Sequence, residues 1–335
     1  EALSAFKNIK RNLKKAIEYL RKKRPDVLIL IDYPDFNIRV GEFARRHGIK
    51  VLYYVSPQVW AWRKKRRFRI RDLAERIAVV LPFEESLYRE IGSRVEFVGH
   101  PVMEEIEYVE GILKIKTEEG LYDLRTQAKK MLGISGDRTV ITLLPGSRPS
   151  ELKRHIPVLK DTALGLQRRF PGSVCLMPVA PNLGDEFRAQ MEYFSGYGVR
   201  VLPPFLDNCS SAVLSLMGSD VAIAASGTVV LQAGLLGVPT VVIYRLSKLT
   251  YLIGRILVDV RYITIPNIIF NREVFPELLQ ERASAGNIIR EVEKFLEDER
   301  LRESVKADLR RLREIFLNKR PSQRVAEMVR EMAGW

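Results

Sequence analysis

Short runs of apolar residues alternate with longer amphipathic stretches along almost the whole chain. The runs are rich in Val, Ile and Leu, which is typical of strands buried on both faces of a parallel sheet. The stretches between them repeat apolar residues with the period of a helix. This alternation predicts an α/β fold with parallel sheets that helices cover on both faces. The expected strands are residues 27–31, 50–54, 76–81 and 94–98 in the first half, and 139–143, 173–178, 199–202, 220–225 and 239–243 in the second.

The pattern divides the chain into two Rossmann-like halves. We expect a first domain over residues 1–134, a second over residues 135–317, and a C-terminal helix over residues 318–335 that packs back on the first domain. Residues 111–119 are expected to form a surface connection. Because a helix precedes the first strand at Val27, where such a domain usually opens with a strand, we expect the first domain to be truncated at its N-terminus.

One strand end carries residues that suit phosphate binding. Gly146, Ser147 and Arg148 follow the strand over residues 139–143 and precede a long helix. Backbone N–H groups and the positive end of a helix dipole therefore meet at this turn. Arg148 adds a planar cation that matches phosphate oxygens. The alternative is an ordinary strand–helix loop with a solvated arginine.

A second strand end repeats the arrangement. Ser226, Gly227 and Thr228 follow the strand over residues 220–225 and begin another apolar helix. Ser226 and Thr228 are candidate caps of that helix, and Gly227 allows a ligand close to the backbone. A plain helix cap is the alternative. The two turns together suggest a diphosphate held between helix N-termini.

Few titratable side chains stand at strand ends. Asp32 directly follows the first strand and is a candidate general base, unless it caps the next helix or pairs with a basic neighbour. Asp35 is the better candidate for that cap. His100 follows the fourth strand and is a candidate for proton transfer or for orienting a ligand, with a structural role as the alternative. His47 and His155 are expected on helix surfaces.

The segment after the second strand combines tryptophan with positive charge. Trp60 and Trp62 precede a run of basic residues from Arg63 to Arg71. Such a segment suits stacking on nucleic-acid bases, and it suits an anionic membrane surface equally well. A solvated basic helix is the third interpretation.

Composition narrows the classes of partner and compartment. The chain has 335 residues, of which 46% are hydrophobic, so it is globular and long enough for two domains. Its formal net charge of +14 indicates an anionic partner. Two cysteines, Cys175 and Cys209, without metal-ligand spacing, indicate a reducing compartment. No metal site is expected, and no apolar run approaches the roughly 20 residues of a membrane span.

Several of these segments also match a known family, in the same order along the chain. They are Ile31–Asn37, Tyr54–Pro57, Val59–Arg63, Leu81–Glu84, Gly99–Pro101, Leu144–Arg148, Ala225–Thr228, Leu236–Pro239, Tyr244–Arg245, Pro266–Asn267 and Arg272–Val274. On these residues the chain resembles lipid-A-disaccharide synthase, a glycosyltransferase family of the two-Rossmann-domain (GT-B) type. The resemblance implies two Rossmann-like domains with a cleft between them, the first on the acceptor and membrane side and the second binding the UDP-sugar.

The resemblance also implies an activity. The family transfers 2,3-diacylglucosamine from UDP to the 6-hydroxyl of 2,3-diacylglucosamine 1-phosphate, which yields the β-1′,6-linked lipid A disaccharide 1-phosphate and UDP. The reaction inverts the anomeric carbon and uses neither a metal nor a cofactor. It takes place on the cytoplasmic face of the inner membrane, to which the enzyme binds peripherally. No nucleic acid is expected as a partner, and a homodimer is possible.

Roles follow for the candidate residues. Asp32 is expected to be the base, with His100 beside it as a second catalytic candidate. Asn267 matches a residue of the family's donor site. Gln232 stands where the family usually has a Glu that accepts hydrogen bonds from the ribose, so this chain keeps one acceptor oxygen and loses a charge. The residues expected to bind the donor or its diphosphate are therefore Gly146, Ser147, Arg148, Ser226, Gly227, Thr228, Gln232 and Asn267.

The membrane and acceptor side is expected to involve aromatic and basic residues of the first half. Two other functions remain open. A UDP-sugar epimerase would share the architecture without using a lipid acceptor, and an inactive, truncated basic protein would bind anionic membranes without a preference for uridine. The residues expected on the membrane side are Phe6, Lys10, Trp60, Trp62 and Arg63.

Overall fold

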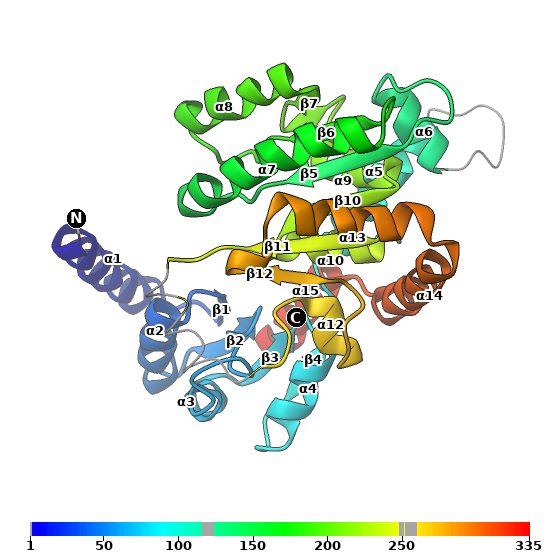
Figure 1. Cartoon of the computed structure of the whole chain (residues 1–335). Coiled ribbons are helices and arrows are strands. Elements are labelled where there is room, and N and C mark those ends of the chain that lie inside the picture. The colour runs from blue at the N-terminus through cyan, green and yellow to red at the C-terminus, as the bar shows by residue number, and fades with distance from the viewer. Residues whose placement is uncertain (1, 116–123, 248–250, 252–259) are drawn as a thin grey trace. The chain divides into compact units, whose positions relative to one another are not determined.

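The computed structural model describes residues 2–115, 124–247, 251 and 260–335, the side chains of residues 2–7, 114, 115 and 185 excepted. These residues form two compact units, seen in Figure 1. The first unit holds Glu1–Pro101 and Asn318–Trp335, and the second holds Val102–Gly254 and Val260–Leu317, in each case as far as the residues are described. Each unit is considered by itself below.

The first unit is built on a four-stranded parallel sheet whose strand order follows the chain. Its first strand reads Val-Leu-Ile-Leu-Ile, without a polar residue, and pairs with the second so that Leu30 faces Tyr53. Proline at the first turn helps to start three of the helices. The strands are β1 (Val27–Ile31), β2 (Lys50–Tyr54), β3 (Arg76–Val79) and β4 (Val95–Phe97), and the helices are α1 (Ala2–Lys23), α2 (Pro34–Arg46), α3 (Arg66–Leu73), α4 (Pro82–Arg89) and α15 (Pro321–Ala333).

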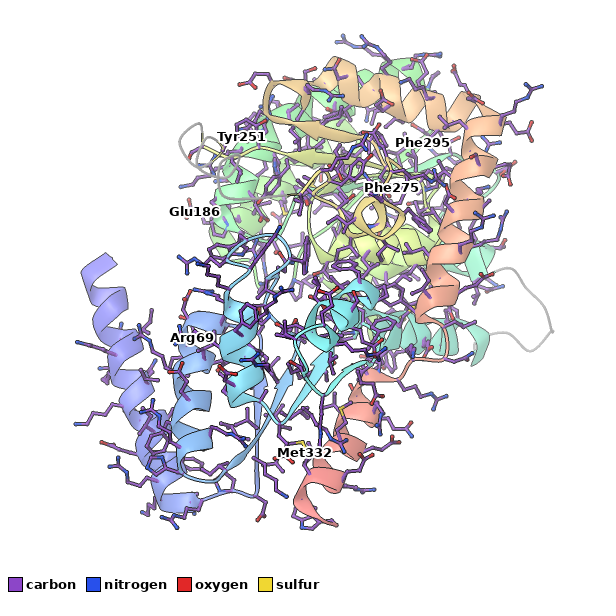
Figure 2. All side chains as sticks on the ribbon, turned by 90° about the horizontal axis from the view of Figure 1, so that it is seen from below. Arg69, Glu186, Tyr251, Phe275, Phe295 and Met332 are labelled. Carbon is purple, nitrogen blue, oxygen red and sulfur yellow. The ribbon has the colours of Figure 1, made fainter. Side chains whose placement is uncertain are left out.

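Apolar side chains fill both faces of this sheet. On one face α2 and α3 bury Ile38 and Ile70 in a core that includes Tyr53, and α1 lies along α2 (Figure 1). On the other face the C-terminal helix α15 inserts Met328 and Met332 against residues of β2, β3 and the end of β4. Figure 2 labels Met332 in this helix. Helix α15 is therefore part of the first unit although the chain reaches it last.

The second unit holds a six-stranded parallel sheet of order β12-β11-β10-β5-β6-β7. From β5 the chain moves outward to β6 and β7, and from β10 it moves outward in the opposite direction to β11 and β12. The order thus reverses between β5 and β10, which is the point where open α/β sheets bind ligands. The strands are β5 (Val140–Leu144), β6 (Val174–Pro178), β7 (Val199–Leu202), β10 (Val221–Ala225), β11 (Thr240–Tyr244) and β12 (Glu277–Leu279), with a separate antiparallel pair of β8 (Phe205–Leu206) and β9 (Cys209–Ser210).

Helices pack around this sheet (Figure 1). The long helix α7 packs against α13, and α6 packs against α9. The helices are α5 (Val102–Ile115), α6 (Leu124–Met131), α7 (Pro149–Arg169), α8 (Asp185–Glu192), α9 (Ser211–Gly218), α10 (Thr228–Leu235), α12 (Ile265–Phe270), α13 (Ala285–Glu297) and α14 (Glu299–Phe316), and short 3-10 turns span Tyr193–Tyr197 and Gln280–Arg282.

Each predicted strand is observed with ends within two residues of the prediction, and the α/β class with parallel sheets is confirmed. The short strands β8, β9 and β12 were not predicted. The surface connection predicted over residues 111–119 is wrong in its first part, since α5 continues to Ile115. The compact units divide after Pro101 and not near residue 134, because α5 and α6 pack on α9 and α10 of the second unit. Buried Ile106, Val109 and Leu113 explain why α5 stays there.

Substitution of Met328 tests the packing of α15. Its side chain is 1% exposed within the cluster formed with Leu52 and Ala78. We expect Met328→Ala to lower the free energy of unfolding by about 2–5 kcal/mol, because it removes buried apolar area and leaves a cavity. Urea unfolding measures the loss. The exposed Arg330→Ala on the same helix should change stability by only about 0.5 kcal/mol. Equal effects of the two substitutions would contradict this packing.

Candidate functional site

Asp32 lies at the carboxyl end of β1 in a left-handed backbone conformation, with φ of 47°, and Tyr33 follows at 37°. Consecutive non-glycine residues in this region are strained and need outside support. The Tyr53 hydroxyl and the Asn37 amide donate to the Asp32 carbonyl at 3.0 and 2.8 Å, and the Asp32 N–H donates to the Tyr54 carbonyl. The carboxylate itself is exposed and has no hydrogen-bond or ion-pair partner among the described residues.

Asp35 does not have the predicted role of helix cap. No side chain caps α2, so a capping role for Asp32 is also wrong. The Asp35 carboxylate instead pairs with Arg66 and lies 3.6 Å from the Arg63 guanidinium. Its place in the first turn, after Pro34, suits the helix dipole without a cap.

His100 is half-buried after β4. Desolvation lowers the pKa of its imidazole from 6.5 to about 4. The ring is therefore neutral at pH 7, and its protonated form is too rare to act as a general acid. A general-acid role for His100 is therefore disfavoured, and the neutral ring can hydrogen-bond a ligand.

Trp60 is half-buried, and its indole N–H points to a buried carboxylate. Its indole N–H donates to Glu84 at 3.2 Å, and its ring packs edge-on against Phe83 at 5.2 Å. Glu84 is 1% exposed and also accepts the Leu81 N–H at 3.1 Å, and the Ser56 hydroxyl lies at 3.5 Å. Burial raises the pKa of the Glu84 carboxyl to about 7. In the sequence Glu84 was named only within a segment that matches the family and was given no role, although Glu at the third position of a helix is a capping signal.

Trp62 lies on the surface between cations. The guanidinium groups of Arg63 and Arg66 lie 4.6 and 5.4 Å from the centre of its ring. Phe68 is likewise exposed, with the Arg71 guanidinium at 5.4 Å. Such stacked cation–aromatic pairs suit an anionic interface. We call Trp62, Arg63, Arg66, Phe68 and Arg71 the basic-aromatic surface.

The remaining membrane-side candidates lie on α1. Lys10 is exposed, and Lys14 and Lys15 farther along the helix are exposed too. The side chain of Phe6 lies outside the described residues. None of the described helices is both long and apolar enough to cross a membrane.

The ends of β5 and β10 meet in the second unit. Gly146 has φ of 109°, and a Cβ atom on it would lie 2.6 Å from Glu151 Oε2 and 3.5 Å from Ala225 Cβ. Only glycine fits this turn without displacing its neighbours. The two predicted phosphate-binding turns are therefore adjacent, as the strand order requires.

The first of these turns already holds an anion of its own. The backbone N–H groups of Ser147 and Arg148 donate to Glu151 Oε2 at 3.3 and 3.4 Å, and Arg148 Nη1 donates to Oε1 at 2.9 Å. Glu151 is buried, whereas the Arg148 side chain is 74% exposed. Glu151 was not predicted as a site residue, although its place as the third residue of α7 is a capping signal. The exposed guanidinium of Arg148 remains able to turn toward a ligand.

The second turn is open. Neither Ser226 nor Thr228 caps α10, contrary to prediction, because the Ser226 hydroxyl lies 3.5 Å from the Ile263 carbonyl instead. A Cβ atom on Gly227 would have no atom within 4 Å. Among the described residues the N–H groups of Thr228 and Val229 have no acceptor, whereas the Val230 N–H donates to the Gly227 carbonyl at 3.1 Å. Two open N–H groups make this turn the better anion site of the two.

Gln232, one turn into α10, is largely buried and donates its amide hydrogen to Glu105 Oε2 of α5 at 2.7 Å. This use of the amide nitrogen leaves the carbonyl oxygen of Gln232 as its acceptor. Glu105 is exposed and was not predicted as a site residue. A carboxylate thus stands beside Gln232 on a neighbouring helix.

Asn267 is fully buried, and its predicted contact with the donor has no support in the structure. Its amide nitrogen donates to the Phe275 carbonyl and to Glu277, and its oxygen accepts the N–H groups of Val274 and Phe275. Glu277 also accepts the N–H and the hydroxyl of Thr264. This network lies inside the second unit, where Figure 2 labels Phe275, and it shapes the chain before and after α12.

The prediction that His155 lies on a helix surface is wrong, because its side chain is fully buried in α7. Its ring nitrogens lie 2.8 Å from the Pro145 carbonyl and 3.1 Å from the Arg245 N–H. Burial lowers the pKa of this imidazole. The burial of His155 was difficult to predict from the sequence, because both of its hydrogen-bond partners are backbone groups of loops.

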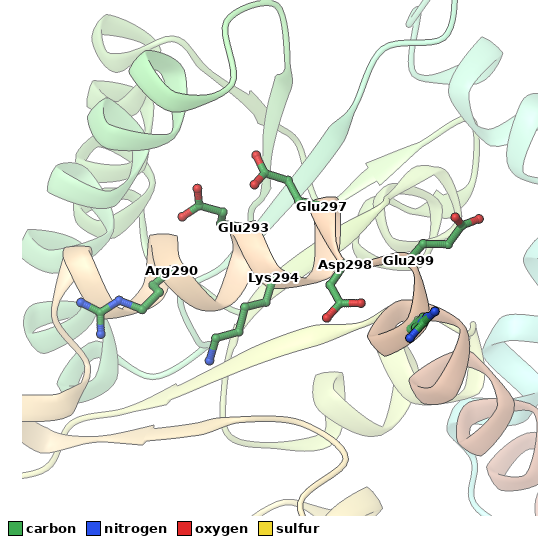
Figure 3. A pocket seen from close by; sticks show the side chains of 7 residues that line it. Arg290, Glu293, Lys294, Glu297, Asp298 and Glu299 are labelled. Atoms are coloured by element: carbon green, nitrogen blue, oxygen red, sulfur yellow. The ribbon is translucent and has the colours of Figure 1, made fainter.

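A separate surface pocket is formed by charged side chains of α13 and α14 (Figure 3). Two of its carboxylates, Glu293 and Glu297, already bind Arg169. Lys294 pairs with Glu291 on the same helix. This pocket lies away from the strand ends and gives no catalytic arrangement. Within the described part of the chain, no group of three or more His, Cys, Asp or Glu side chains could hold a metal ion.

Comparison with known proteins identifies the family. The family model for lipid-A-disaccharide synthetase (LpxB) matches residues 1–331. The lipid-A-disaccharide synthase of Geobacter sulfurreducens is 40% identical over 311 residues, which are 92% of this chain and 76% of that protein. That of Nitrosococcus oceani is 40% identical over 307 residues, 91% of this chain and 74% of the relative. The chain belongs to the lipid-A-disaccharide synthase family. It is accordingly a glycosyltransferase, as predicted.

Solved structures share the fold of this family member at low identity. UDP-GlcNAc 2-epimerase from Neisseria meningitidis, bound to UDP-GlcNAc, has a TM-score of 0.65 at 15% identity and covers 96% of this chain and 81% of its own. Staphylococcus aureus MnaA, in a co-structure with UDP, has a TM-score of 0.66 at 11% identity and covers 97% and 80%. These likenesses confirm the GT-B type of fold and carry no activity to this chain.

The buried carboxyl of Glu84 generates a pH prediction. Its pKa is raised from 4.5 to about 7, so the native state holds a proton that the unfolded state has lost between these values. Its contribution to stability is complete below pH 4.5 and is lost as the pH rises through 7. The loss amounts to roughly 2–4 kcal/mol. Glu84→Gln removes this titration, so the stability of the wild type should fall relative to the variant between pH 5 and 8. Urea unfolding at several pH values measures the difference, and parallel profiles would refute the assignment.

Proposed function

We propose that this chain transfers 2,3-diacylglucosamine from UDP to the 6-hydroxyl of 2,3-diacylglucosamine 1-phosphate and releases UDP. Family membership supports the reaction. The observation that carries the proposal is the reversed strand order between β5 and β10, which brings the turns at Gly146 and Gly227 together. A diphosphate is the part of the donor that such paired turns suit.

The diphosphate binds chiefly at the N-terminus of α10. Its open N–H groups at Thr228 and Val229 donate to the anionic oxygens, and Arg148 turns from Glu151 toward the phosphates. The charge on the leaving UDP is stabilised there by fixed donors, which cost no reorganisation during the reaction. The hydrogen bonds of 3.3 and 3.4 Å from the first turn to Glu151 are long, so a diphosphate can replace this carboxylate.

Gln232 and Glu105 act together on the ribose. The Gln232 carbonyl oxygen accepts a hydrogen bond from a ribose hydroxyl, while its amide group stays bound to Glu105. Glu105 supplies the negative charge that Gln232 lacks. A carboxylate at position 232 would instead repel Glu105.

Asp32 serves as the base that removes the proton of the acceptor hydroxyl. It is exposed and free of partners among the described side chains, while Tyr53 and Asn37 fix its backbone. Neutral His100 orients a substrate oxygen. The inversion follows from a single displacement at the anomeric carbon, which uses one base and one stabilised leaving group.

The enzyme works on the cytoplasmic face of the inner membrane as a peripheral protein. The basic-aromatic surface and the lysines of α1 support this proposal, because arginine and tryptophan suit the headgroup region of anionic lipids. Both lipid substrates are held in that membrane. A homodimer stays a proposal without a specific supporting contact.

Ligand-induced thermal shifts test the donor site. UDP at 100 times its Kd should stabilise the protein by about 2.7 kcal/mol, and ADP should not. Arg148→Ala should weaken UDP binding by about 10- to 100-fold, since it removes a hydrogen-bonded cation. Arg154→Ala, on the same helix, serves as the matched control. Equal shifts with UDP and ADP, or equal loss in the two variants, would remove this assignment.

Turnover of the lipid substrates tests the base. Asp32→Asn should reduce kcat by about 10²–10⁴-fold, because it removes general-base assistance and keeps the size of the side chain. Asp35→Asn, three residues away, weakens the ion pairs of an exposed carboxylate with Arg63 and Arg66 and should retain most activity. A mass-spectrometric assay of the disaccharide measures both. Wild-type turnover in Asp32→Asn would exclude Asp32 as the base.

A further inference from the structure

His155 makes two hydrogen bonds whose directions fix its tautomer. The Arg245 backbone N–H can only donate, so Nε2 of the imidazole must accept it at 3.1 Å. The hydrogen of the neutral ring therefore lies on Nδ1, which donates to the Pro145 carbonyl at 2.8 Å. The ring is fully buried, so water replaces neither partner. The side chain thus holds two loops in one defined protonation state.

The two loops flank the open N-terminus of α10. Pro145 directly follows β5 and precedes the turn at Gly146, and Arg245 directly follows β11. In the sheet, β5 and β11 are the two neighbours of β10. His155 therefore connects the chain on one side of the β10 turn to the chain on its other side.

We infer that His155 is a positioning residue for a nucleoside diphosphate, because it fixes the spacing of the two loops between which the α10 turn binds the phosphates. The inference rests on the proposed donor site. It adds a residue that makes no contact with the ligand and acts through the backbone of Pro145 and Arg245. A loop held in place before binding costs less ordering when the ligand arrives.

The neutral ring is required, and its surroundings favour it. Burial lowers the pKa of His155, and the nearby Arg245 and Arg154 act in the same direction. Glu151 and the hydrogen bond to Pro145 oppose them, and the Tyr244 ring lies 6.5 Å away. Protonation of Nε2 would set one donor against another at Arg245. Since the folded-state pKa lies below the ordinary value, the connection is complete at neutral pH and is lost as the pH falls through that lowered pKa.

Two substitutions each keep one of the two bonds. His155→Asn places an amide near the position of Nδ1 and can still donate to Pro145, whereas His155→Gln reaches toward Arg245 and can still accept. We expect each variant to bind UDP about 3- to 10-fold more weakly than the wild type at pH 7.5, the effect of one lost hydrogen bond. Isothermal titration calorimetry measures the affinity. The matched control is Thr162→Val, which removes a buried hydrogen bond within the same helix and should lower stability without changing UDP affinity.

A purely structural role would give a different result. Both His155 variants would then lose thermal stability, as Thr162→Val does, and bind UDP like the wild type, which would overturn the inference. Wild-type protein that fails to bind UDP would overturn the proposed donor site and this inference together.

A measurement on the unsubstituted protein covers the case in which the variants do not fold. Because binding requires the neutral ring, saturating UDP should lower the pKa of His155 in nitrogen-15 NMR spectra of the histidine rings. The exposed His47 serves as the internal reference. A His155 pKa that does not change on addition of UDP would contradict the inference.

Discussion

Parallel pairing of β10 with β5 on one side and β11 on the other is the constraint on which the donor half depends. Parallel strands need crossover helices, so all their carboxyl ends lie at one edge of the sheet. The chain moves outward in opposite directions from β5 and from β10, so the turns after these two neighbouring strands lie side by side at the switch point. This strand pairing determines the positions of Gly146, Gly227 and Arg245. No local sequence motif could bring these three residues together.

Buried acceptors shape the loops at the strand ends in both units. Glu151 holds the first turn of α7, Glu277 holds the chain before α12, and Glu84 holds Trp60. Each accepts N–H groups that would otherwise be buried without a partner. Asp32 is the exception, since its backbone is fixed and its carboxylate has no partner among the residues that the structure describes. A carboxylate that serves no structural bond is available to accept a proton.

Prediction from sequence succeeded where the signal was local. Strands such as β1 and β10 are continuous apolar runs, and the glycine turns follow them directly, so both could be placed from periodicity alone. Prediction failed where the hydrogen-bond partner of a side chain lies far away in the sequence. His155 was expected on a helix surface, because its partner Arg245 becomes a neighbour only after the sheet forms. The inward position of the Trp60 indole was not foreseen for the same reason, because its N–H donates to Glu84.

Family membership identifies the chain as a glycosyltransferase, and the geometry adds which turn should hold the charge. Because Glu151 caps the start of α7 and the start of α10 is open, phosphate oxygens are expected at α10 and not at α7. A crystal structure of this protein with UDP tests the account most directly. We expect the diphosphate against the backbone N–H groups at Thr228, with the Arg148 guanidinium turned toward it. UDP bound away from the β5–β10 switch point, or no contact with α10, would contradict the account.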